Sequence, residues 1–167
     1  MSGMRSTLAA LAVAFAAAGL VAVSAQENPP DYSQDLAWMS AQQSALATRA
    51  ASGEWQALEG GLLWRRVAGD GIGPKPTVDD VVTVHYAGSF VSGETFDSSY
   101  DRGEPATFPL GRLVPAWQRA IPQMAVGDTI ELAAPAALAY GPKGKGPIPG
   151  GATLLFTVEL LGIGEGG

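Results

Sequence analysis

The chain has 167 residues and no cysteine, and its 16 acidic and 10 basic side chains give a net charge of −6. This length fits one ordinary domain. The lack of cysteine excludes a disulfide framework, a cysteine nucleophile and a zinc ribbon, and a single histidine, His85, excludes most histidine-dependent catalysis. Binding of nucleic acid requires a basic surface, which this acidic chain with few lysines does not offer. We therefore expect a protein or a small molecule as the partner.

The first 25 residues have the pattern of a secretory signal. A single positive charge at Arg5 precedes an apolar run from Leu8 to Val23, and small residues up to Ala25 precede a polar stretch. We expect cleavage after Ala25 and an exported, periplasmic protein with no stable membrane span after cleavage. The alternative is an uncleaved anchor, although the apolar run is shorter than the roughly 20 residues that span a bilayer.

Residues 26–60 are predicted to form a helical extension and a linker. Residues 35–52 are rich in alanine, which favours a helix, and Gly53 is suited to end it. One face of this helix is formed by Leu36, Met39, Gln43 and Leu46 or Ala47. That face either docks on the main domain or pairs with a second copy, so a monomer and a weak dimer are both open.

After residue 61, short apolar runs alternate with Gly and Pro, which predicts a sheet. Strands are expected at 62–67, 81–91, 107–110, 129–135 and 152–161. One short helix fits at 115–121, because Pro115 suits a first helical turn and Pro122 limits its continuation. The expected fold class is α+β: an antiparallel sheet with one short helix laid across it. The main domain is predicted to span 61–163, followed by a flexible tail at 164–167.

Alternation along two of these strands predicts their buried faces. These faces carry Val82, Val84 and Tyr86 on the first strand, and Leu154, Phe156, Val158 and Leu160 on the second. The glycine-rich segments at 69–74 and 141–151 do not indicate a nucleotide site. The first is followed by prolines instead of a helix, and the second lacks the Lys-Ser/Thr ending of a phosphate-binding loop.

Four motifs occur in order: VTVHYAG, FDSSYDRGEP at 96–105, FPLGRLVPAW at 108–117, and LAYGPKGKGPIPGGATLLFTVELL at 138–161. Together they resemble the FKBP-type peptidyl-prolyl cis-trans isomerases over residues 61–163. The resemblance implies a half-open antiparallel sheet wrapped around a short helix, with an apolar pocket that accepts a substrate proline. It also implies isomerisation of Xaa-Pro bonds in unfolded or partly folded proteins, with no cofactor and no metal.

The resemblance also assigns roles to residues. The implied substrate-binding residues are Tyr86, Phe96, Arg102, Phe108, Leu113, Val114, Trp117 and Phe156. The implied catalytic residues are Asp97, which faces the twisting carbonyl, and Tyr140 and Ile148, whose hydroxyl and backbone N–H donate to substrate carbonyls. From the five-residue spacing in FDSSYDR we further expect Arg102 to pair with Asp97 and to keep its carboxylate ionised and oriented.

Departures from the family pattern leave macrolide inhibitors open as ligands. Ala106 stands where many members have an aromatic residue, and Arg112 lies beside the position of a macrolide-contacting carboxylate in longer members. The 142–151 loop carries Lys143 and Lys145 and has no large apolar tip.

Alternative interpretations remain. His85 is expected to be structural, because it alternates away from Tyr86. The tryptophans expected to serve packing are Trp38, Trp55 and Trp64. The alternative function is a chaperone or binding module with the same fold and little isomerase activity.

Overall fold

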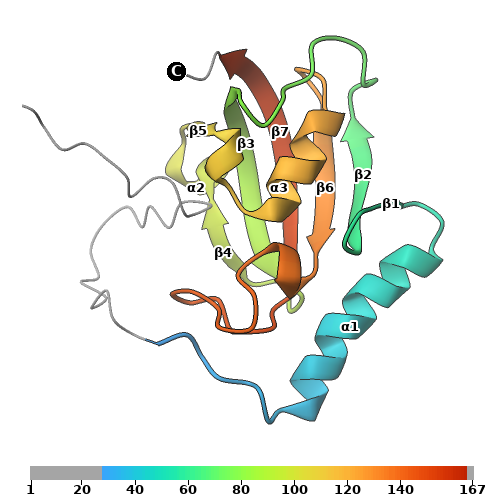
Figure 1. The fold of residues 1–167 in the computed structure, drawn as a ribbon, viewed down its shortest axis with the longest axis vertical. Helices are drawn as coiled ribbons and strands as arrows, with labels where there is room; N and C mark the ends of the chain where they lie inside the picture. The colour runs from blue at the N-terminus through green and yellow to red at the C-terminus, as the bar shows by residue number, and fades with distance from the viewer. Residues whose placement is uncertain (1–27, 165–167) are drawn as a thin grey trace, which may run out of the picture.

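The computed structural model describes residues 28–164, in which a seven-stranded antiparallel sheet is crossed by a short helix (Figure 1). The strand order is β1-β2-β6-β7-β3-β4, and β5 pairs with the first half of β3, on the same edge that β4 pairs with further along. The strands are β1 (Gln56–Leu58), β2 (Leu62–Ala68), β3 (Val81–Phe90), β4 (Thr95–Ser98), β5 (Ala106–Pro109), β6 (Thr129–Ala134) and β7 (Leu154–Gly164). The helices are α1 (Leu36–Ala51), α2 (Ser99–Arg102) and α3 (Pro115–Ala120), with three short 3₁₀ turns at Leu110–Arg112, Ile121–Gln123 and Ala136–Leu138.

Strict alternation of apolar residues builds the face of the sheet that α3 covers. On β3, Val82, Val84 and Tyr86 are fully buried, while the residues between them are half-exposed. β7 follows the same pattern, with every second residue from Leu154 to Leu160 buried. Both predicted faces are confirmed, as is the α+β fold class.

Helix α3 begins and ends where its prolines predict. Pro115 occupies the first turn, where its missing N–H has no intrahelical acceptor to lose, and Pro122 lies in the 3₁₀ turn that follows. Ala116, Trp117 and Ala120 form the buried side of this helix. The small alanines let α3 approach the sheet closely, so that the large Trp117 indole fills the space between them.

The predicted strands are all present, with bounds shifted by a few residues, but three short elements were missed. β1 lies in the predicted linker, and β4 and α2 lie at the start of the motif at 96–105, for which no strand or helix was predicted. Each has only three or four residues, which is too short to show a period of alternation.

Helix α1 is confirmed, but its predicted packing face is correct only in part: Met39 and Leu46 are half-buried. The helix starts after Asp35, whose carboxylate accepts the N–H of Trp38, and it ends at Ser52 before Gly53 with φ of 76°. Leu36 and Gln43, predicted to face inward, are exposed, and Gln42 is buried instead. The face is displaced because Gln42 makes hydrogen bonds to the main domain that hydrophobic periodicity does not represent.

Two predicted segments fall mainly outside the described residues: the secretory signal at 1–25 and the tail, of which only Gly164 is described, as the end of β7. Between residues 28 and 164, no helix has the length and apolar character needed to cross a membrane.

A buried carboxylate, Asp128, connects the turn before β6 to the end of β2. It accepts hydrogen bonds from the N–H groups of Gly71 (3.1 Å) and Ala125 (3.0 Å) and from the guanidinium of Arg66 (3.0 Å). Burial alone would raise the pKa of Asp128, but these three donors outweigh burial and lower the pKa from its ordinary value of 3.8.

Replacing Asp128 should therefore destabilise the fold in a pH-dependent way. We expect Asp128→Asn to lower the free energy of unfolding at pH 7 by about 2 kcal/mol, measured by urea denaturation. The ionised carboxylate stabilises the folded state fully above its unfolded pKa, and this contribution is lost as the pH falls through the lower folded pKa. The difference between the wild type and the variant should thus shrink on acidification. The control is Asp79→Asn at an exposed position; equal effects of the two substitutions at pH 7 would contradict the assignment.

Candidate functional site

The candidate site is built around Trp117, against which three other rings pack. The ring centroids of Tyr86, Phe108 and Phe156 lie 5.3, 6.3 and 5.5 Å from that of Trp117, at interplanar angles of 79–88°. These edge-to-face contacts fix the ring orientations and form an aromatic floor between α3 and the sheet. The floor is closely packed: Trp117 and Tyr86 are both 0 % exposed.

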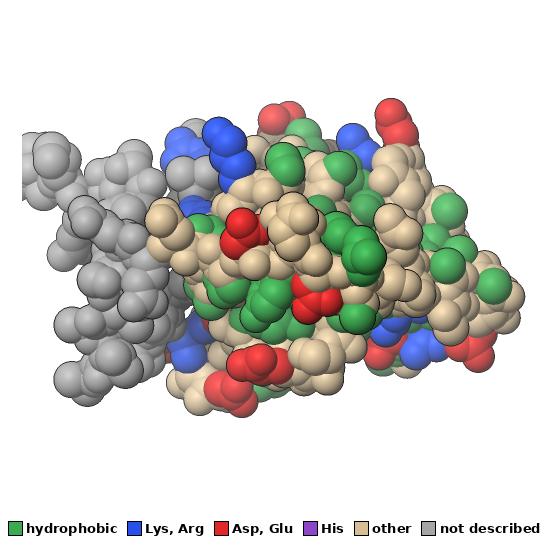
Figure 2. Space-filling model, turned by 90° about the horizontal axis from the view of Figure 1, so that it is seen from below, with side chains coloured by type: hydrophobic (Ala, Val, Ile, Leu, Met, Phe, Trp, Pro, Cys, Tyr) green, Lys and Arg blue, Asp and Glu red, His purple; other side chains and the backbone are tan. Residues whose placement is uncertain are grey.

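The rim of the site is more accessible than its floor. Phe96 and Tyr140 are half-buried and pack against the same hydrophobic cluster. Phe96 forms an edge-to-face contact with Phe156, at 5.9 Å between centroids. Figure 2 shows the face that carries the loop between β6 and β7, where hydrophobic side chains gather with acidic side chains beside them.

All the apolar residues assigned to the pocket by resemblance meet in one cluster. They are Tyr86, Phe108, Leu113, Val114, Trp117, Ile148 and Phe156, with Phe96 and Tyr140 packed against them. They come from β3, β4, β5, α3 and its preceding turn, β7 and the β6–β7 loop, so the site exists only when the sheet has closed around α3.

An ion pair lies at the edge of this aromatic floor. Arg102 Nη1 donates to Asp97 Oδ1 at 2.5 Å, the Tyr86 hydroxyl donates to Asp97 Oδ2 at 2.6 Å, and Arg102 Nη2 donates to the Tyr86 hydroxyl at 2.9 Å. The Asp97 side chain is 4 % exposed and that of Arg102 is 15 % exposed. The expected pairing of these two residues is therefore present in the structure, and Tyr86 completes a triangle that spacing did not predict.

Burial and the hydrogen bond to Asp97 favour the protonated form of the Tyr86 hydroxyl. Burial raises the pKa of Tyr86 well above its ordinary value of 10, and the hydrogen bond to Asp97 raises it further. At physiological pH this hydroxyl is therefore a neutral donor directed at Asp97. The carboxylate thus has one oxygen held by a cation and the other by a phenol.

Residues of β4 and α2 hold the triangle in place. The Ser98 hydroxyl accepts the N–H of Asp101 and caps α2, the short helix that ends at Arg102. The fully buried Ser99 hydroxyl accepts the Tyr86 N–H at 2.7 Å and contacts the Tyr86 carbonyl oxygen at 3.2 Å. His85 contacts the same hydroxyl through Nδ1 and stacks on Tyr100, as expected for a structural residue.

The N–H of Ile148, which the resemblance assigns to a substrate carbonyl, has an acceptor within its own loop. This N–H donates to the carbonyl oxygen of Lys145 at 2.9 Å, and the N–H of Lys145 donates to the Ile148 carbonyl at 2.9 Å. The two residues form an isolated β-bridge inside the loop, so the Ile148 N–H already has an acceptor. Its buried side chain remains part of the hydrophobic cluster.

Close packing within the β6–β7 loop determines where Tyr140 and Ile148 lie. A Cβ at Gly144 would lie 2.1 Å from the Ile148 carbonyl oxygen, and one at Gly150 would lie 2.0 Å from the Pro142 carbonyl oxygen. Both distances are shorter than real Cβ contacts, so the loop closes on itself only with glycine at these two positions.

Gly88 is a site residue that the assignment by resemblance did not include. A Cβ there would lie 2.6 Å from Phe96 Cζ and 2.9 Å from Phe156 Cε1. The Phe96 and Phe156 rings therefore occupy the space that a side chain on β3 would fill. The sequence signal was the glycine inside a strand, which often marks the close approach of another group.

The site combines an apolar aromatic floor with one buried, oriented ion pair at its edge, an arrangement suited to an apolar ring beside a polar group. Similarity to known proteins identifies the family. The profile of the FKBP-type peptidyl-prolyl cis-trans isomerase family matches residues 73–161. The chain belongs to this family.

Relatives and solved structures agree with this assignment. The chain is 46 % identical to the FKBP-type peptidyl-prolyl cis-trans isomerase FkpA of Aeromonas hydrophila over 71 % of this chain and 44 % of that protein. It is 48 % identical to an FKBP-type 22 kDa peptidyl-prolyl cis-trans isomerase of Escherichia coli over 63 % of this chain and 51 % of the relative. The crystal structure of FkpA from Escherichia coli superposes with a TM-score of 0.73 at 35 % identity, covering 80 % of this chain and 62 % of that one. The matches thus span about half the length of the two curated relatives.

Filling the space at Gly88 should open or distort the aromatic wall. We expect Gly88→Ala to displace the Phe96 ring and to weaken binding of short proline peptides about tenfold, measured by NMR titration. The matched control is Gly162→Ala, also in a strand, where a Cβ would meet nothing within 4 Å. Equal peptide affinities of the two variants would show that Phe96 and Phe156 do not shape the binding surface.

Proposed function

We propose that this chain is a cofactor-independent prolyl isomerase that acts on proline-containing, unfolded or partly folded proteins. The observation that carries the proposal is the aromatic floor of Tyr86, Trp117 and Phe156, with the Asp97–Arg102 pair at its edge. Membership of the FKBP-type family supports the same activity.

The reaction requires only that amide resonance be weakened. Rotation about the C–N bond is opposed by a barrier of roughly 18–20 kcal/mol, because the planar amide has partial double-bond character. The planar amide is strongly dipolar and the twisted state is less so. An apolar cleft therefore disfavours the planar state relative to the twisted one, and neither a nucleophile nor a metal is needed.

In this proposal the floor binds the proline ring and the polar groups orient the bond that rotates. Trp117 and Phe156 form a floor that excludes water, with Val114 and Phe96 as walls. Asp97 faces the twisting carbonyl, and Arg102 and Tyr86 hold its carboxylate in one orientation. The Tyr140 hydroxyl donates to a substrate carbonyl. Restricting the orientation of the substrate in this way lowers the entropy cost of reaching the twisted state.

Replacing the Asp97 carboxylate should reduce turnover more than it reduces stability. We expect Asp97→Asn to lower kcat/KM for a short Xaa-Pro peptide at least about tenfold, and Tyr140→Phe to lower it less, both measured by NMR exchange spectroscopy. The matched control is Asp101→Asn, an exposed acid in α2, which should leave the rate unchanged.

Thermal unfolding of each variant must be measured together with these rates, because Asp97→Asn leaves Arg102 without its anionic partner in a mostly buried position. If the folded wild-type chain accelerates exchange no more than buffer does, across several residues before proline, the isomerase proposal is wrong. Such a result would favour a binding module with the same pocket.

The N-terminal pattern supports an exported protein with periplasmic clients. Its apolar run from Leu8 to Val23 and the small residues up to Ala25 are typical of a cleaved signal.

Macrolides that bind FKBP-type pockets are further candidate ligands. We expect these compounds to bind weakly, because Ala106, which lies in β5 two residues before Phe108, is small and offers little surface to a bulky ligand.

Export predicts a defined N-terminus. Mass spectrometry of the protein recovered from a periplasmic fraction should give a chain that begins at Gln26. Ala25→Arg should block processing, because the cleavage site requires a small residue. Recovery of the full-length chain in the membrane fraction would instead establish the anchor.

A further inference from the structure

Helix α1 contacts the main domain at the point where the β6–β7 loop ends. Gln42 is 6 % exposed and Thr153, next to the start of β7, is 3 % exposed. The Thr153 N–H donates to Gln42 Oε1 at 2.9 Å, and the Thr153 hydroxyl donates to the Gln42 carbonyl oxygen at 3.1 Å. Gln42 Nε2 donates to the carbonyl oxygen of Trp38 at 3.2 Å, which fixes the amide orientation. Thr153 lies just before β7, and the Gln42 side chain gives its backbone N–H the acceptor that a paired strand would otherwise provide.

A second contact reinforces the first. A Cβ at Gly151 would lie 3.7 Å from Trp38 Cζ3, so the indole of α1 lies close over the backbone at Gly151. Trp38 also packs against the hydrophobic core and stacks on Tyr32, with 5.1 Å between ring centroids. Ala152 and Thr153 at the end of the loop are buried, whereas Gly151 stays exposed beside the indole.

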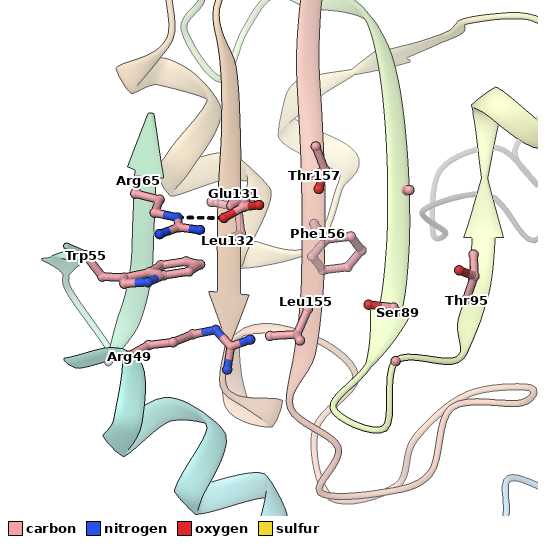
Figure 3. Close-up of a pocket in the computed structure, with 12 residues that line it drawn as sticks. Arg49, Trp55, Arg65, Ser89, Thr95, Glu131, Leu132, Leu155, Phe156 and Thr157 are labelled. Carbon is pink, nitrogen blue, oxygen red and sulfur yellow. Dashed lines mark hydrogen bonds and ion pairs between the residues drawn. The ribbon is translucent and has the colours of Figure 1, made fainter. Parts of the chain in front are cut away.

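The other end of α1 is attached to the sheet independently of the loop. Figure 3 shows the Trp55 ring between the guanidinium groups of Arg49, from α1, and Arg65, from β2. The two guanidinium carbons lie 5.4 and 4.9 Å from the Trp55 ring centroid. Arg65 Nε also donates to Glu131 Oε2 on β6 at 2.6 Å. This cluster forms one side of a groove of about 330 Å³ on the outer face of the sheet.

The β6–β7 loop carries two of the residues assigned to substrate, Tyr140 and Ile148. Its base is closed by the Gly151 N–H, which donates to the Gly141 carbonyl at 2.9 Å, and the Gly144 N–H donates to the Tyr140 carbonyl at 3.1 Å. Because the loop is hydrogen-bonded within itself, a shift at its base moves Tyr140 and Ile148 together. Gly151 at that base is two residues from Thr153.

We propose that α1 acts as a strut that fixes the β6–β7 loop over the pocket, and that Gln42 is a positioning residue for the isomerase reaction. This inference rests on the proposed function. One end of α1 is held on the sheet through Arg49 and Trp55, and Gln42 near its middle holds Thr153 in place. Loss of the Gln42 acceptor leaves a buried N–H without its partner, and the loop must shift to hydrate it.

The test uses the full chain with Gln42→Met, which keeps the side-chain length and removes the acceptor. The matched control is Gln43→Met, the same change on the exposed neighbouring position of α1. We expect Gln42→Met to speed amide hydrogen exchange of residues 141–153 about tenfold and to lower kcat/KM for proline peptides about fivefold. The loss in kcat/KM should come from a higher KM rather than from a lower kcat. A contact that serves only stability would lower Tm and leave KM as it is in the control.

A second pair of variants covers the case in which Gln42→Met fails to fold. Thr153→Val removes the hydroxyl that donates to the Gln42 carbonyl and preserves the side-chain shape, whereas Thr153→Ser restores the hydroxyl. Val should raise KM and Ser should restore it toward the wild-type value.

Three outcomes separate the possibilities. Unchanged exchange at 141–153 in Gln42→Met and Thr153→Val overturns the strut. Faster exchange with unchanged KM shows that α1 holds the loop without positioning the substrate contacts, which overturns the role of Gln42 in the reaction. A wild-type chain without isomerase activity refutes the proposed function and with it the positioning role of Gln42 in the reaction, and the exchange data then decide the strut alone.

Discussion

The pairing of β3 with β7 is the constraint on which the rest of the structure depends. It runs antiparallel from Val81 opposite Gly164 to Phe90 opposite Leu154, with one irregularity near Thr83. Because side chains alternate between the faces of a sheet, a shift of one residue would turn Tyr86 or Phe156 away from α3. The other edge of β3 pairs with β5 and then with β4, so the same strand also fixes Phe108 and Asp97. The aromatic floor and the ion pair are two consequences of one register.

The site places a charged pair where charge is costly. Removing Asp97 and Arg102 from water carries a desolvation penalty of several kcal/mol per ion, which their mutual attraction offsets only with good geometry and further hydrogen bonds. The Tyr86 hydroxyl supplies such a bond to each partner. The resulting group is oriented before any substrate arrives, so it needs no reorganisation when the substrate bond twists. A solvent-exposed pair would be screened and mobile, and would orient little.

Elements with a clear period could be predicted from the sequence, and those that depend on single contacts could not. Alternation identified the buried faces of β3 and β7, and Pro115 identified the start of α3. The packing face of α1 was predicted only in part, because its most buried residue is the polar Gln42, which is held by hydrogen bonds rather than by apolar area. β1 and β4 are too short for alternation to show.

The site shows the same division. The apolar residues that the motifs assigned to the pocket all lie in one cluster. Their agreement has a physical reason, since large apolar side chains that follow the family's order along the chain can pack in few ways. The hydrogen bond from the Ile148 N–H to the Lys145 carbonyl could not be predicted, because a backbone hydrogen bond of this kind leaves no trace in side-chain types. Gly88 contributes by the absence of a side chain, and only the positions of Phe96 and Phe156 show why that absence is required.

The segment before residue 73 lies outside the family match and is nevertheless joined to the same core. Trp64 of β2 is buried, and β2 pairs with β6 along most of its length. Gln42 and Thr153, 111 positions apart, are hydrogen-bonded to each other. The entropy cost of closing a chain loop grows only with the logarithm of its length, so a distant segment can be attached at little more cost than a near one. An extension attached at the base of the substrate-facing loop is therefore a place where sequence change can alter the pocket while the residues that line it stay the same.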